Sequence, residues 1–75
     1  MRYEDLCWEE AAICNDYAEI VINYCRENNI DLSGPSEAEN AILECNREKL
    51  DFKKWCSIDL DYFLDDIIVA IGMHE

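Results

Sequence analysis

Apolar residues recur at helical spacing through most of this chain, and the pattern predicts three amphipathic helices. The first spans residues 3–28, the second 36–56 and the third 58–72. Turn-forming residues at 28–35, NNIDLSGP, separate the first helix from the second. The second helix either continues to residue 56 or breaks near 46–51, which would make four helices.

The first predicted helix carries an apolar arc that is wider than contact with one neighbour requires. Part of this arc is a stripe of small residues: Cys7, Ala11, Cys14, Ala18 and Cys25. Small side chains let a second helix backbone approach closely. We expect this helix to pack between two others of its own fold; the alternative is a homodimer interface along the stripe. The polar side carries four predicted partner-binding residues: Trp8, Glu9, Asp16 and Glu19.

The third predicted helix combines the most apolar stretch of the chain with four aspartates. One broad face is expected in the core: Leu60, Phe63, Leu64, Ile67, Ile68 and Ile71. Successive residues are about 100° apart round a helix, so a second group of apolar residues falls within an arc of about 40° and forms a strip in the middle of the outer side. It consists of Ile58, Tyr62 and Val69, with Asp61 and Asp65 on one flank and Asp59 and Asp66 on the other. An apolar centre with a charged rim is typical of interfaces, so these seven residues are predicted to bind a partner. The alternatives are a helix buried on two sides, or three scattered apolar residues that are exposed without a function.

Local signals suggest where the later helices begin. Ser36 with Glu39 has the spacing of a capping box, in which the serine is the N-cap. Ser57 is a candidate N-cap for the last helix, and Asp59 is a second candidate.

Length and composition favour a single all-α domain over residues 1–75, a small helical bundle. Apolar residues make up 51 % of the chain, enough for a core, and only two glycines and one proline leave little room for an all-β fold. The N-terminal sequence does not have the form of a secretory signal, and no apolar run approaches the roughly 20 residues of a membrane span. We therefore expect a cytoplasmic protein whose five cysteines are reduced and mostly buried.

The chain is strongly acidic, with 18 acidic residues against six basic ones and a formal net charge of −12. This charge repels phosphates, so we predict no direct binding to nucleic acid or to a membrane, and it favours a partner protein with a basic surface. The alternative is that acidity serves solubility alone. Most of the basic residues fall in one window: Arg47, Lys49, Lys53 and Lys54. They would contact an acidic helix of the same molecule or a second copy, or lie in solvent.

Motifs for catalysis are not evident in the sequence. The only histidine, His74, is the penultimate residue, and no base is evident for a cysteine nucleophile. The closest cysteines are seven positions apart, unlike the close pairs of zinc and iron–sulfur sites. Size, acidity and helix content resemble acyl carrier proteins, but their D-S-L motif is replaced around Ser36 by Gly-Pro-Ser-Glu. We predict a non-enzymatic protein without metal or cofactor.

Together these patterns predict an acidic protein-binding module. The best interpretation is an inhibitor that mimics nucleic acid charge and occupies a basic, nucleic-acid-binding site on its partner. Such small acidic proteins are common among phage-encoded anti-defence and host-takeover proteins. The alternative is a self-associating helical dimer module, joined through the first helix, with a structural or adaptor role.

Overall fold

The computed structural model describes residues 8–74, for Trp8 the backbone alone, and these residues form four α-helices and no strand. The helices are α1 (Trp8–Asn28), α2 (Pro35–Glu48), α3 (Phe52–Cys56) and α4 (Leu60–His74). The all-α class is confirmed, and the second predicted helix breaks into two within the expected window. Residues 3–7 of the first predicted helix lie outside the described part of the chain.

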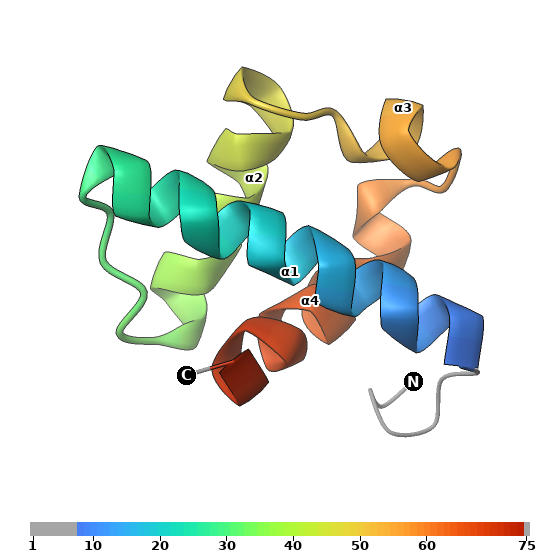
Figure 1. The fold of residues 1–75 in the computed structure, drawn as a ribbon, viewed down its shortest axis with the longest axis horizontal. Coiled ribbons are helices and arrows are strands. Elements are labelled where there is room, and N and C mark those ends of the chain that lie inside the picture. The colour runs from blue at the N-terminus through green and yellow to red at the C-terminus, as the bar shows by residue number, and fades with distance from the viewer. Residues whose placement is uncertain (1–7, 75) are drawn as a thin grey trace.

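Helix α1 packs against two neighbours of its own fold. Figure 1 shows α1 running across the molecule with α2 and α4 against it, and α2 and α4 also contact each other. Three residues of the small-residue stripe lie inside the bundle: Cys14 and Ala18 are fully buried and Cys25 is nearly so. Ala11 is half-buried. A homodimer through the first helix could not use these three side chains, because they already fill the core.

Aromatic rings fill the centre of the core. Tyr17 of α1 meets Phe52 of α3 edge-on, with ring centroids 4.8 Å apart, and Phe52 meets Phe63 of α4 at 6.3 Å. All three side chains are fully buried. The Tyr17 hydroxyl donates a 2.8 Å hydrogen bond to the carbonyl of Leu50, which satisfies the buried phenol and ties α1 to the α2–α3 link.

The break between α2 and α3 is held by side chains that cap the backbone. The Asn46 amide oxygen accepts a hydrogen bond from the Phe52 N–H at 2.6 Å, and the Asp51 carboxylate accepts one from the Lys54 N–H at 3.1 Å. These bonds satisfy N–H groups that have no partner within a new helix. The chain therefore turns before α3, and this turn places Phe52 in the core.

The predicted N-cap roles of Ser36 and Ser57 are wrong. Helix α2 begins at Pro35 with Gly34 as its N-cap, so Ser36 already lies inside the helix. Proline suits this first position because the missing N–H would have had no helical partner. Ser57 adopts the left-handed conformation, with φ of 65°, and is the C-cap of α3, not the N-cap of α4. Asp59, the second candidate, directly precedes α4.

The cysteines that the structure describes are mostly in the core, as expected. Cys14, Cys25 and Cys45 are buried, and Cys56 is half-buried. Cys7 lies outside the described residues. Burial raises the pKa of the Cys14 thiol to about 12, and the nearby charge of Asp66 adds to the effect. The Cys14 thiol therefore stays protonated at neutral pH, which suits a packing role more than a reactive one.

Candidate functional site

The outer side of α4 is the predicted partner surface, and most of it is accessible. Tyr62 is 60 % exposed and Val69 is 44 % exposed. Three carboxylates beside them are also exposed: Asp59, Asp61 and Asp65. We call these five residues the α4 face. The four that belong to α4 point outward because the opposite side of the helix, which includes Phe63 and Ile67, is buried against α1 and α2.

Two residues predicted for this surface are placed elsewhere. Ile58 is half-buried and packs against the core. Asp66 was expected on the exposed rim and is only 5 % exposed, which corrects that prediction. Because successive residues are about 100° apart round a helix, Asp66 lies only about 60° round the axis from the buried Phe63, so it belongs to the inner half of the helix.

The burial of Asp66 changes its chemistry. Burial raises the pKa of its carboxyl group, and the nearby charges of Asp65 and Glu10 raise it further. Asp66 therefore contributes to the inside of the bundle and is not available to a partner.

The acidic residues predicted on α1 form a separate surface. Glu9, Asp16 and Glu19 are exposed, while the side chain of Trp8 lies outside the described residues. Glu19 lines a hollow together with Arg26 and His74. His74 also joins α4 to α1, because its Nε2 lies 2.6 Å from Oδ1 of Asn15. The predicted site is thus two surfaces. On α1, Glu19 borders Arg26 and His74. On the α4 face, Asp61 and Asp65 form no ion pair with a basic side chain of residues 8–74.

Several exposed apolar residues were missed by the sequence reasoning. Leu43 is 40 % exposed, and Met73 is 68 % exposed one helical turn beyond Val69. Leu43 shares a surface hollow with Tyr62, Asp59 and Asp61. The signal for Leu43 was its position on α2, about 100° round the helix from the buried Ile42 and outside the main apolar stripe.

The basic window pairs mainly with acidic residues of the same molecule. Lys53 lies 3.2 Å from Asp59, and Lys49 lies 3.5 Å from Glu27. Both pairs are exposed, so each stabilises the fold by at most about 1 kcal/mol. Within residues 8–74, no basic side chain pairs with Asp61 or Asp65. Among the described residues, these two carboxylates therefore carry negative charge that no ion pair compensates.

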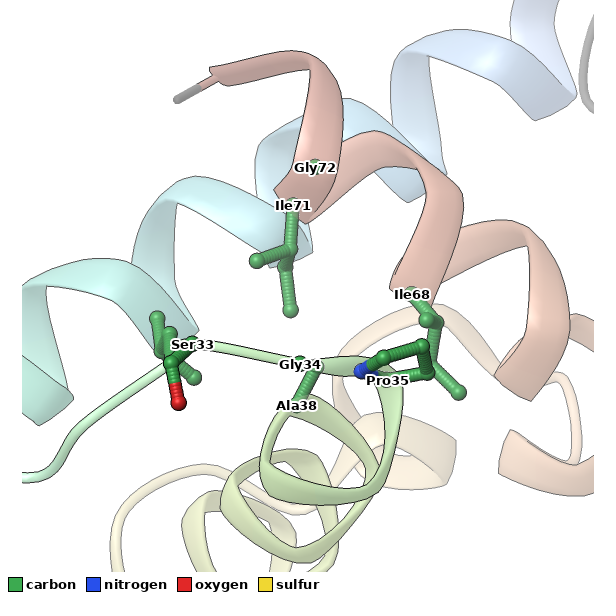
Figure 2. A pocket seen from close by; sticks show the side chains of 8 residues that line it. Ser33, Gly34, Pro35, Ala38, Ile68, Ile71 and Gly72 are labelled. Atoms are coloured by element: carbon green, nitrogen blue, oxygen red, sulfur yellow. The ribbon is translucent and has the colours of Figure 1, made fainter.

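A small apolar pocket of about 190 Å³ lies between the start of α2 and the end of α4. Figure 2 shows the side chain of Ile71 pointing from α4 toward Gly34 and Ala38. Its other lining residues are Leu32, Ser33, Pro35, Ile68 and Gly72. The lining includes no titratable side chain, and the volume is below the roughly 300 Å³ at which ligand pockets begin. The pocket therefore offers no acid–base or metal chemistry.

Other kinds of site find little support in the described part of the chain. Residues 8–74 contain no group of three or more histidine, cysteine, aspartate or glutamate side chains that could hold a metal ion. None of their helices is long and apolar enough to cross a membrane. Comparison with known proteins finds no matching family model, curated relative or solved structure. The α4 face is the site that the geometry favours.

Proposed function

We propose that this chain is a non-enzymatic acidic protein that binds a basic surface of a partner protein through the α4 face. One observation carries the proposal: the exposed side chains of Tyr62 and Val69 lie on the same helix side as carboxylates that no described basic residue neutralises. A face needed only for solubility would not require the two apolar side chains.

The two kinds of side chain have different tasks in binding. Tyr62 is an aromatic anchor of the kind that supplies most of the affinity in protein interfaces. Asp61 and Asp65 are four residues apart, so they follow each other along the helix at a rise of about 6 Å. Such a row of negative charges steers a basic partner toward the face and fixes its register.

A nucleic-acid-binding site is the kind of basic surface that fits best. Such sites are lined by lysine and arginine for contact with phosphates, and they would accept a row of carboxylates in the same way. The chain would then act as an inhibitor by occupying the site. A phage-type anti-defence or host-takeover protein would have this activity, and Glu9 and Asp16 on α1 would provide a second acidic contact.

The test is affinity capture from the cells that encode the chain, with the wild type and the double variant Asp61→Lys/Asp65→Lys as bait. The variant should lose the partner, because both steering charges become repulsive. The matched control is Asp31→Lys/Glu39→Lys, which makes the same change of charge at exposed positions away from α4 and should retain the partner. Circular dichroism checks that all three proteins are equally helical.

Competition then tests the inhibitor role. Added duplex DNA or RNA should release the captured partner, because nucleic acid and the α4 face would occupy one site. Equal capture by the Asp61→Lys/Asp65→Lys variant would refute the role of the α4 face. Retention of the partner in excess DNA and RNA would refute the nucleic-acid-binding site as the target.

A further inference from the structure

Three exposed apolar side chains lie in a line along the outside of α4. Tyr62 is 60 % exposed, Val69 is 44 % exposed and Met73 is 68 % exposed. Because successive residues are about 100° apart round a helix, these three lie within an arc of about 40°. Single exposed apolar residues are common on protein surfaces, whereas these three share one side of one helix. We call them the outer row.

A row of negative charge runs beside the outer row. Asp61 and Asp65 are exposed and lie about 60–100° round the helix from Tyr62, both in the same direction. Neither forms an ion pair with a basic side chain of residues 8–74. His74 is the only basic residue of α4, and its ring contacts Asn15 of α1. One side of α4 therefore combines an apolar row with a parallel acidic row.

The spacing of both rows matches that of a second helix. Tyr62 and Val69 are seven positions apart and Val69 and Met73 are four apart, which gives separations of about 10.5 Å and 6 Å along the axis. An amphipathic helix presents apolar side chains at these same separations, because they recur after four and seven positions. Its side chains can pack between those of α4 as ridges into grooves. A helix laid beside α4 thus meets the whole outer row over three turns.

Backbone hydrogen bonding also favours a helix as the occupant. The N–H and C=O groups in the middle of α4 are bonded within α4 itself, so they have nothing to offer a neighbouring strand. An extended segment laid on this surface would leave its own backbone groups unpaired, which is costly once water is removed. A helix satisfies its backbone internally and brings only side chains to the contact.

We propose that the element of the partner protein that docks on α4 is a basic amphipathic helix. This inference rests on the function proposed above and specifies the part of the partner that α4 recognises. The apolar residues of the docked helix pack against the outer row, so the contact reaches one turn beyond the α4 face to Met73. Lysine or arginine residues four positions apart on its flank lie opposite Asp61 and Asp65. A second copy of α4 contains no lysine or arginine to supply this basic row.

Two synthetic peptides of identical composition provide the probe. Both contain 18 residues of leucine, arginine and alanine. In the ordered peptide the leucines share one helix side and the arginines flank it four positions apart, whereas in the shuffled peptide they are spread round the helix. Fluorescence anisotropy at 0.15 M salt should show that the full chain binds the ordered peptide about tenfold more tightly or better. Both peptides have the same charge, so this difference isolates the paired rows.

Variants of the chain locate the contact. Met73→Ser should weaken binding of the ordered peptide about tenfold, because a buried methionine side chain is lost from the interface. Met73→Leu keeps an apolar side chain at that position and should recover the binding. Asp61→Asn/Asp65→Asn should also weaken it, whereas the matched control Asp31→Asn/Glu39→Asn removes the same charge away from α4 and should bind like the wild type. Circular dichroism checks that each variant is folded.

Equal affinity for the ordered and shuffled peptides, or unchanged binding by Met73→Ser, would overturn the docked helix. The natural partner separates this inference from the proposed function. A captured partner that Asp61→Lys/Asp65→Lys loses and Met73→Ser retains would refute the three-turn helix contact and leave the proposed function standing. Capture that is unaffected by Asp61→Lys/Asp65→Lys would refute the proposed function, and the docked helix with it.

Discussion

Helices α1 and α4 are both amphipathic and both acidic on the outside, yet they use their apolar residues differently. The wide apolar arc of α1 is buried within the fold, because α2 and α4 both pack against it. Helix α4 also fills the core, but it leaves Tyr62, Val69 and Met73 exposed, the first two beside the carboxylates of the α4 face. The width of an apolar arc thus indicates how many internal neighbours a helix has. Apolar residues isolated within an acidic side indicate a surface available to other molecules.

The strongest test of this comparison is the same substitution on the two helices. Ala18→Arg should unfold the protein, because it places an unpaired charge in the filled core, at a cost of about 3–5 kcal/mol or more. Val69→Arg should change the free energy of unfolding by no more than about 0.5 kcal/mol, since this position is exposed. Urea denaturation followed by circular dichroism measures both. A folded Ala18→Arg protein would show that α1 has room for an outside partner after all.

The next test removes one polar contact of α1. Tyr17→Phe deletes the hydroxyl that donates to the Leu50 carbonyl and leaves that partly buried acceptor without this donor. The expected loss is about 1–3 kcal/mol in the free energy of unfolding. Tyr62→Phe is the matched control on α4, because the exposed hydroxyl of Tyr62 should contribute little. Equal losses from the two substitutions would mean that the α2–α3 link does not depend on this hydrogen bond.

A smaller gain is expected at the end of α4. A methyl group added at Gly72 would meet no atom within 4 Å, so the fold itself has no need for glycine there. Gly72→Ala should raise the free energy of unfolding by about 0.4–1 kcal/mol, because alanine loses less backbone entropy on folding. The shift of the urea midpoint measures this gain. A destabilised variant would show that the last turn of α4 is more crowded than its surroundings indicate.

The subtlest test concerns pH. The pKa of Asp66 is raised in the folded protein, chiefly by burial, so the folded state holds a proton at this carboxyl more tightly than the unfolded chain does. The stability gained from this tighter proton binding is fully present below the unfolded pKa of about 4, and it is lost as the pH rises through the pKa of the folded state. Relative to Asp66→Asn, the wild type should therefore become more stable as the pH falls from 7 toward 4. Urea midpoints of both proteins across this range give the difference, and a constant difference would contradict the raised pKa.

Helical periodicity in the sequence predicts the main elements, but it does not locate their ends. Cys45, Phe52 and Cys56 keep a helical spacing straight through the break, so the apolar pattern alone cannot show it. The informative residues were Asn46 and Asp51, whose side chains cap α3. Their role depends on where the chain turns, which tertiary packing decides.

Exposure on α4 was harder to predict than helix content. Tyr62 and Val69 were expected outside and are exposed, but Asp66 was placed on the wrong side. A helical wheel gives the angle of each residue, whereas the width of the buried arc depends on how many neighbours surround the helix. Asp66 lies within that arc because the buried side of α4 extends past Phe63. The sequence could not predict that this residue is buried, since aspartates rarely are.

The shortness of α3 has a consequence for the order in which the molecule opens. Five residues are too few for a helix to be stable by itself, so α3 persists only while Phe52 is buried and its caps hold. Its amide hydrogens should exchange with solvent ahead of those in the middle of α1 or α4, through local opening that leaves the three longer helices together.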